Sequence, residues 1–382
     1  MADPVDLYLL FLEEGVAEEE PVRSFRSHRD AFEALSEDEF IATFRLSKEA
    51  AREVCEAVRP DLQRTRESRR TTLSVERRVL TALRFYATGA FLGNIGNEET
   101  IACSKRAVSQ AVHEVSEAIL KYLAPKYLRF PTTPEAKLEV KRGFHELAGF
   151  PGCVGAIDGT QVAILQPSIF DPRFVDGNYY CHKGYHSINV LMVCDASMRI
   201  LFLNARFPGS CHDAAVWAAC NLRQATSTVF EEGEWLVGDS GYPLQPWLMT
   251  PVRTPTTPEE KDYNDAHSRT RVCIEQCFGL WKMRFRCLQR YRTLHFAPDR
   301  SCRIINACAV LHNMCLAYNT REPLDNTDEG DAPSGEGAEA GAVGETQEDG
   351  AQEEEDHDSQ PMRNRAAQLR SQLITHGFRR RR

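Results

Sequence analysis

The sequence predicts an α/β protein with a mixed sheet and flanking helices, preceded by an all-α part and followed by a disordered acidic tail. Apolar residues recur at helical spacing up to about residue 147, and shorter apolar runs typical of strands follow. Residues 322–360 have hardly any large apolar side chain, so they cannot bury enough surface to offset the entropy of ordering. We divide the 382 residues into a helical lead-in (1–70), a helix-turn-helix-like domain (71–130), an α/β domain (148–320), a disordered acidic linker (322–360) and a basic C-terminal segment (361–382).

The N-terminal part contains three helix starts of the kind that a Ser cap creates. Ser36 and Glu39 form a capping-box pattern, and Ser74 and Ser104 each precede an amphipathic stretch, with a Gly-rich turn between those two stretches. The polar face after Ser104 carries Lys105, Arg106 and Gln110. This outline predicts either a helix-turn-helix whose last helix contacts DNA through these three residues or a subdomain that serves only packing.

The part from residue 150 onward alternates between strand and helix patterns. We expect strands at Cys153–Leu165, Ser187–Cys194, Ile200–Phe207 and Trp235–Val237, and helices at His212–Cys220, Pro258–Arg286 and Asp299–Tyr318. The first strand is interrupted at Asp158 and Gly159, because Asp-Gly commonly forms a turn. The second and third strands form a hairpin, and Asp195 in its turn has a structural role. A hairpin, a helix and a returning strand describe a sheet with mixed strand directions.

The net charge of −9 combines two neighbouring C-terminal segments of opposite charge. Residues 322–360 contain fifteen Asp and Glu without Lys or Arg, whereas residues 361–382 contain seven Arg without an acid. The rest of the chain is nearly neutral, and such a body binds DNA if its charges segregate by face. Net charge therefore decides nothing about a nucleic-acid partner. The four terminal Arg residues fit a nuclear-import or phosphate-contacting tail, or a solvated basic end without function.

Cysteine usage and hydropathy indicate a soluble protein with reduced thiols. The thirteen Cys residues are scattered and include no Cys-x-x-Cys pair, which disfavours a disulfide framework or a structural zinc site. The N-terminus is acidic, and no apolar run reaches the eighteen or so residues of a membrane span. We expect neither secretion nor a membrane partner.

Three acids have the spacing of a metal-dependent nuclease site. Cleavage of a phosphodiester with two hard cations requires carboxylate oxygens that converge on metals about 3.5–4 Å apart. Asp158 and Asp239 follow strand patterns, and Glu275 lies on the edge of an amphipathic helix. Eighty residues separate the first two acids and 35 separate the last two. Each acid also has a structural alternative, because Asp-Gly and Asp-Ser-Gly form turns and Glu275 can pair with Arg271 one helical turn earlier.

The sequence around these acids resembles the PIF/Harbinger transposases and the Harbinger transposase-derived nucleases of animals, over roughly residues 70–320. The blocks that carry the resemblance are GAIDGTQVAI, HKGYHSINVLMVCD, RFPGSCHDAAVW, WLVGDSGYPLQPWLMTP and YNDAHSRTRVCIEQCFGLWKMRFRCL, in this order. The resemblance implies an RNase H-like fold at residues 150–290, in which Asp158, Asp239 and Glu275 are ligands for Mg²⁺ or Mn²⁺. It also implies a helix-turn-helix at residues 74–120.

The resemblance adds further site residues. Asp213 lies in the block after the Pro-Gly turn and is carried over as a fourth metal ligand, with a helix N-terminal Asp favoured by the macrodipole as the alternative. Arg271, Lys282 and Arg286 fall on the same helical stripe as Glu275. They would contact phosphates near bound metals, although solvated cations are common on any amphipathic helix.

Three functions follow as expectations, the third of which is an interaction protein that works through the acidic tail and a partner. The first is a metal-dependent DNA nuclease, a hydrolase acting on ester bonds, in a transposase or a domesticated relative. The alternative is a DNA-binding protein that keeps the scaffold without catalysis. The resemblance further implies DNA and a separate Myb-like DNA-binding protein as partners, and we expect a location in the nucleus, also with the cytoplasm, and self-association into a homo-oligomer.

Overall fold

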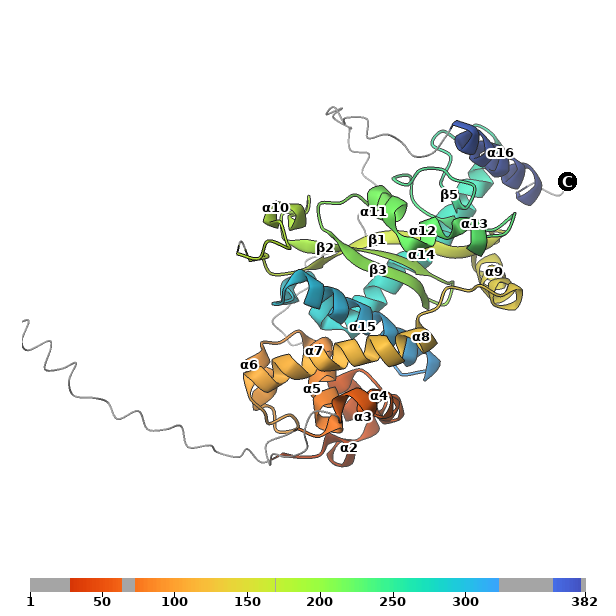
Figure 1. Ribbon diagram of the computed structural model, residues 1–382. Helices are drawn as coiled ribbons and strands as arrows, with labels where there is room; N and C mark the ends of the chain where they lie inside the picture. The colour runs from red at the N-terminus through yellow and green to blue at the C-terminus, as the bar shows by residue number, and fades with distance from the viewer. Residues whose placement is uncertain (1–27, 64–72, 169, 323–359, 379–382) are drawn as a thin grey trace, which may run out of the picture.

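The computed structural model describes residues 28–63, 73–168, 170–322 and 360–378 (Figure 1). The acidic linker beyond residue 322, the first 27 residues and the terminal Arg379–Arg382 lie outside this part, and so do the predictions made for them. Within the described ranges, no helix has both the length and the apolarity to cross a bilayer.

The N-terminal helices form a bundle around α7. Its helices are α2 (Ala31–Ala34), α3 (Glu37–Phe44), α4 (Lys48–Leu62), α5 (Val75–Thr88), α6 (Leu92–Asn97), α7 (Lys105–Tyr122) and α8 (Ala124–Tyr127). The capping box of Ser36 and the caps of Ser74 and Ser104 form as predicted. The apolar side of α7 packs against α4, α5 and α6, and α15 (Pro298–Ala317) lies beside it (Figure 1). The bundle is therefore packed directly onto the rest of the molecule.

A five-stranded sheet of order β3-β2-β1-β4-β5 forms the second part (Figure 1). Its strands are β1 (Cys153–Ala163), β2 (Ser187–Cys194), β3 (Ile200–Pro208), β4 (Trp235–Val237) and β5 (Leu248–Met249). The first three strands pair antiparallel, whereas β4 pairs parallel with β1 and β5 pairs parallel with β4. This mixed α/β arrangement is consistent with an RNase H-like fold. The sequence did not predict β5, because two residues are too short for a periodic pattern.

The predicted interruption of the first strand is wrong. β1 continues through its centre, where Asp158 pairs opposite Met192 and Gly159 opposite Leu191. Gly159 does not form a turn but allows the carboxylate of Asp213 to approach the strand closely. A Cβ atom at this position would lie 2.1 Å from Oδ1 of Asp213. Glycine within a strand often marks such an approach. Asp158 is therefore a residue of the central strand.

The helices around the sheet hold its strands from several sides. Contacts join α9 (Pro134–Ala148) to β1, α14 (Pro258–Arg284) to β1, β2 and β4, and α15 to β3, while α11 (Asp213–Ala219) contacts β2. Short elements complete the chain: α10 (Asp176–Tyr179), α12 (Asn221–Gln224), α13 (Thr226–Val229), η1 (Arg286–Leu288) and η2 (Arg290–Arg292). Because α14 ends at Arg284, Arg286 does not continue the stripe of Glu275 as predicted.

The basic C-terminal segment forms α16 (Gln360–Gly377), which packs against α14 of the α/β part (Figure 1). The ring of Phe378 contacts those of Phe150 and Tyr263, with centroids 5.7 and 5.6 Å away. Arg370 donates hydrogen bonds to the carbonyls of Thr250 and Pro251. The basic C-terminal segment is thus helical as far as Gly377 and bound to the body of the protein.

Candidate active site

Asp158 and Asp239 lie side by side because of the register between β1 and β4. Ala156 pairs with Val237 in this parallel pair, so the acids two residues further along occupy equivalent positions on neighbouring strands. Neighbouring strands are about 4.8 Å apart. Asp239 follows the end of β4 and accepts a hydrogen bond from the backbone N–H of Gly241 at 3.0 Å. Two of the three predicted catalytic acids therefore meet at one place in the sheet.

Arg271 of α14 joins Asp158 to the third acid. Its Nη2 lies 2.8 Å from Oδ2 of Asp158 and 3.2 Å from Oε1 of Glu275. Asp158 also accepts a hydrogen bond from the N–H of Gly159 at 2.8 Å. The side chain of Glu275 is 57% exposed, whereas that of Asp158 is 16% exposed. The proposed structural partner of Glu275 is therefore real, and the guanidinium bridges two of the three acids.

The environment of Asp158 favours its protonated form. Burial is the largest cause that raises the pKa of this carboxyl to about 6, and the neighbouring charge of Asp239 adds to it. Arg271 and the Gly159 N–H oppose the shift without cancelling it. A buried acid beside a like charge is an arrangement that a bound cation would relieve.

Tyr242 points its hydroxyl into the same region. Burial raises the pKa of this phenol well above its ordinary value, and nearby carboxylates of three separate elements raise it further. These carboxylates belong to Asp213, Asp158 and Asp239. The hydroxyl is buried and has no hydrogen-bond partner within the described part of the chain. Sequence reasoning missed this residue, because a Tyr after an Asp-Ser-Gly turn looks like ordinary core.

Asp213 lies on the other face of the sheet. It begins α11, and its Oδ1 accepts a hydrogen bond from Nδ2 of Asn189 at 2.7 Å. The carboxylate stands over Gly159, and consecutive residues of a strand face opposite sides. Asp213 thus approaches β1 from the side opposite the side chain of Asp158. Its role as a fourth ligand remains a prediction of the resemblance.

The carboxylates are the right kind of ligand for a hard cation, but in this structure they are not arranged as a complete metal site. Carboxylate oxygens are the ligands that Mg²⁺ and Mn²⁺ prefer. Across residues 28–63, 73–168, 170–322 and 360–378, however, no group of three or more His, Cys, Asp or Glu side chains has metal-binding geometry. Asp158 and Asp239 are adjacent, and the buried Tyr242 hydroxyl has no hydrogen-bond partner. The residues fit a cation on these two acids, and Glu275 is linked to Asp158 through Arg271.

The predicted DNA-contacting residues fall into two groups. Lys105, Arg106 and Gln110 are exposed at the start of α7, where Gln110 donates to Glu114 at 2.8 Å. In contrast, Nζ of Lys282 donates to Oγ1 of Thr160 at 2.8 Å and to the carbonyl of Gln161 at 2.9 Å. Lys282 therefore fastens α14 to β1 in this structure. Arg286 is half-buried in η1.

Comparisons with known proteins agree with this geometry. Residues 157–313, which include all four acids, match the family model of the DDE superfamily endonucleases. The chain is 38% identical over 251 residues to "Putative nuclease HARBI1" of Homo sapiens, which covers 65% of this chain and 70% of that protein. The protein of the same name from Xenopus laevis is 34% identical over 311 residues, covering 81% and 82%. "Protein ALP1-like" of Arabidopsis thaliana is 29% identical over 299 residues, covering 72% and 70%. No solved structure matches the chain.

Proposed function

Because the chain belongs to a Harbinger transposase-derived family within the DDE superfamily of endonucleases, we propose that it is a divalent-metal-dependent DNA nuclease. Asp158, Asp239 and Glu275 act as its metal-binding carboxylates, and it hydrolyses phosphodiester bonds. The observation that carries this proposal is the proximity of Asp158, on β1, and Asp239, two residues after the end of the neighbouring β4, which is close enough for the charge of Asp239 to raise the pKa of Asp158. Nothing in folding requires two acids at such positions, where their repulsion costs stability without a cation.

The side chains around the acids have separate tasks in this proposal. Mg²⁺ or Mn²⁺, when bound, would activate water and stabilise the leaving oxygen. Asp158 and Asp239 hold the cation, and Asp213 is a further candidate ligand. The Tyr242 hydroxyl, which has no hydrogen-bond partner within the described residues, would be available to donate to a carboxylate oxygen that holds the cation and to orient it. Arg271, which bridges Asp158 and Glu275 in this structure, would be available to contact a phosphate of the DNA if a cation took its place between the two acids.

DNA is held by cations outside the carboxylate cluster. The bundle of α5 to α7 acts as a helix-turn-helix, in which Lys105 and Arg106 contact phosphates and Gln110 faces base edges. Arg286 adds a contact near the nuclease part. We further propose a nuclear location, with the cytoplasm as a second compartment, a Myb-like partner protein and self-association.

One observation favours a second function, a DNA-binding protein without catalysis. The Arg271 guanidinium neutralises Asp158 and Glu275 from within the chain, which a permanently metal-free site would also require. The position of Asp239 next to Asp158 argues for the nuclease, because Arg271 forms its ion pairs with Asp158 and Glu275, and Asp239 adds a further negative charge to the cluster.

Plasmid nicking by the purified chain tests the proposal. Supercoiled plasmid and short duplexes are incubated with Mg²⁺, with Mn²⁺ or with EDTA, and nicked product is quantified on gels. We expect nicking with either cation and none with EDTA, because the carboxylates require a cation to act on a phosphodiester. DNA binding without nicking under every condition would favour the second function instead.

The raised pKa of Asp158 predicts a pH-dependent cation affinity. Below a pKa of about 6 a proton competes for this carboxyl, so Mn²⁺ affinity should fall by about tenfold per pH unit. In the metal-free protein, the stability of the fold depends on pH in the opposite direction to cation affinity. The raised pKa of Asp158 stabilises the fold below the ordinary carboxyl pKa of 3.8, and this stabilisation is lost as pH rises through about 6. Titration calorimetry from pH 5 to 8 measures both affinity and proton release. A constant affinity across this range would contradict the assignment of Asp158 as a ligand.

A further inference from the structure

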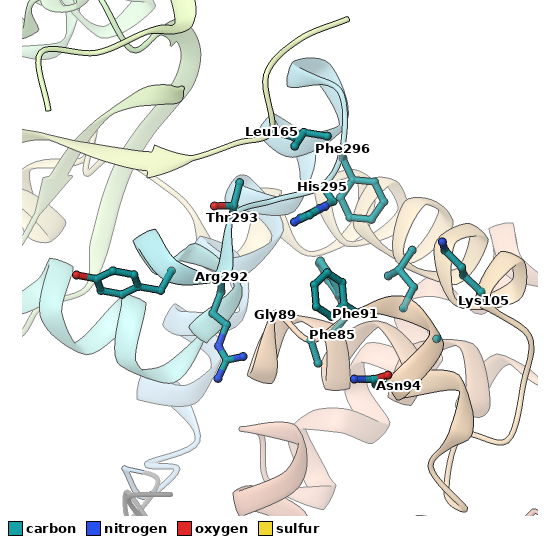
Figure 2. A pocket seen from close by; sticks show the side chains of 14 residues that line it. Phe85, Gly89, Phe91, Asn94, Lys105, Leu165, Arg292, Thr293, His295 and Phe296 are labelled. Atoms are coloured by element: carbon teal, nitrogen blue, oxygen red, sulfur yellow. The ribbon is translucent and has the colours of Figure 1, made fainter. Parts of the chain in front are cut away.

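A pocket of about 720 Å³ lies between the helical bundle and the nuclease part (Figure 2). One wall comes from the turn between α5 and α6, and the other comes from residues 291–296 and Leu165, which follows β1. Figure 2 shows the ring of Phe91 facing His295, with Lys105 and Arg292 on opposite sides. The size falls within the range of small-molecule and cofactor sites, but the pocket is open to a longer ligand at its exposed rim.

The pocket exposes large flat side chains. Phe91 is 71% exposed and Tyr291 is 77% exposed, while Leu165 is half-exposed at the edge. The rings of Phe91 and His295 meet edge to face, with centroids 5.7 Å apart. Exposed aromatic surface of this kind, beside cations, commonly marks a binding site and not a packing defect.

The backbone around the pocket is fixed before any ligand binds. Gly89 ends α5 in the left-handed conformation, with φ +62°, and a Cβ atom there would lie 2.9 Å from Cα of Cys287. The N–H of Leu165 donates to the carbonyl of Leu294 at 2.9 Å, and the N–H of Leu294 donates to that of Ala163 at 3.0 Å. Both walls are therefore anchored to β1 and to the end of α14, and a preformed pocket loses little entropy on binding.

Aromatic and cationic side chains continue from the pocket towards the start of β2. The guanidinium of Arg290 lies 4.8 Å from the ring centroid of Tyr185 and 6.0 Å from that of Tyr291. Beyond them, the rings of Tyr180 and His186 meet at 5.3 Å. Alternating rings and cations are the surface chemistry of single-stranded nucleic-acid sites, where bases stack and phosphates pair with cations.

The pocket also lies at a suitable distance from the acids. Ile164, which follows the end of β1 and bridges to Leu294 beside the pocket, is six residues beyond Asp158, or about 20 Å along the extended chain. At about 3.4 Å per nucleotide, the spacing of each strand in stacked duplex DNA, this corresponds to about six nucleotides. Lys105, the first residue of α7, lines the other side of the pocket. A DNA strand that reaches from α7 to Asp158 would pass this point.

We propose that the junction pocket binds an unstacked base of the DNA, from a single-stranded or locally opened stretch about six nucleotides from the cleaved phosphate. The base stacks on Phe91 and Tyr291, and Lys105 and Arg292 contact its flanking phosphates. This inference rests on the proposed function in taking DNA as the ligand. A flat, polyanionic ligand matches the rings and the cations together, whereas an apolar peptide would match only the rings.

The test compares overhang and blunt duplexes in EDTA, so that cleavage plays no part. Fluorescence anisotropy gives the affinities, and 2-aminopurine in the single-stranded overhang reports stacking by loss of its emission. The double variant Phe91→Ala with Tyr291→Ala should bind the overhang duplex roughly 5- to 150-fold more weakly, the range for loss of base stacking. Its affinity for the blunt duplex should stay within about threefold. Both side chains are mostly exposed, so the variant should retain its circular dichroism and melting temperature.

Two further variants complete the design. Phe91→Trp keeps a stacking surface and should retain overhang binding and quenching, whereas Phe170→Ala removes a ring that is 89% exposed outside the pocket and should change neither. The proposal is overturned if the wild type binds both duplexes equally, if the double variant weakens both equally, or if it weakens neither, which would leave the pocket to a protein partner. Failure of nicking with intact overhang binding would contradict only the proposed nuclease activity.

Discussion

Asp239→Asn is expected to lower the rate of metal-dependent plasmid nicking by about a thousandfold. Removing a metal-binding carboxylate forfeits several kcal/mol of transition-state stabilisation, and about 4 kcal/mol corresponds to this factor. Asn keeps the side-chain oxygen that accepts the N–H of Gly241, so the turn after β4 should survive. Single-turnover nicking with saturating Mn²⁺, beside calorimetry of Mn²⁺ binding, separates loss of the cation from loss of chemistry.

Asp239 is a better position for this test than Asp158. Asp158 is bonded to Arg271 and to the N–H of Gly159, so an Asn there would also disturb the ion pair and the centre of β1. The matched control is Asp265→Asn, which changes an exposed acid of α14 away from the cluster and should nick like the wild type. Nicking by Asp239→Asn within tenfold of the wild type would exclude Asp239 from catalysis.

Most of the fold was predictable because its signals are local. Ser caps mark α3, α5 and α7, and the continuous apolar runs of β2 and β4 are found where the sequence predicts them. The error at Asp158 and Gly159 has a long-range cause: the glycine is required by the carboxylate of Asp213, 54 residues away, and not by a local turn. The Asp158-Gly159 pair, of a kind that forms turns in isolation, is held in the extended conformation of β1 by its pairing with β2.

The metal-binding role of Asp158, Asp239 and Glu275 stays a prediction from their order and spacing in the sequence. The structure shows only that Asp158, on β1, lies near Asp239, two residues after the end of the adjacent β4. The sequence cannot reveal that Arg271 reaches Asp158 across 113 positions as well as Glu275 within its own helix. Tyr242 was missed for a related reason, since the three acids that raise the pKa of its phenol come from separate parts of the chain and approach it only in the folded protein.

Glu234→Ala is expected to reduce the free energy of unfolding by roughly 3–5 kcal/mol, the usual loss when one partner of a buried ion pair is removed. Glu234 and Lys137 are both 3% exposed and lie 2.7 Å apart, and Lys141 approaches the same carboxylate at 2.9 Å. The variant leaves the Lys137 ammonium buried without this partner. Urea denaturation at pH 7 measures the change, and the loss should extend to nicking, because Glu234 precedes β4 and fixes the strand that presents Asp239.

The control for this change uses the second acid of Lys137. Glu231 lies 3.5 Å from the same Nζ but is 66% exposed, so Glu231→Ala should cost less than about 1 kcal/mol. Burial would raise the pKa of Glu234, yet hydrogen bonds from Lys137, the Glu231 N–H and Lys141 outweigh it and lower this pKa. The pair therefore stabilises the fold above the ordinary carboxyl pKa, and this stabilisation is lost as pH falls through the lowered value. Equal losses of stability in Glu234→Ala and Glu231→Ala would contradict the prediction, because burial of the Lys137–Glu234 pair would then not be what stabilises the packing of α9 beside the start of β4.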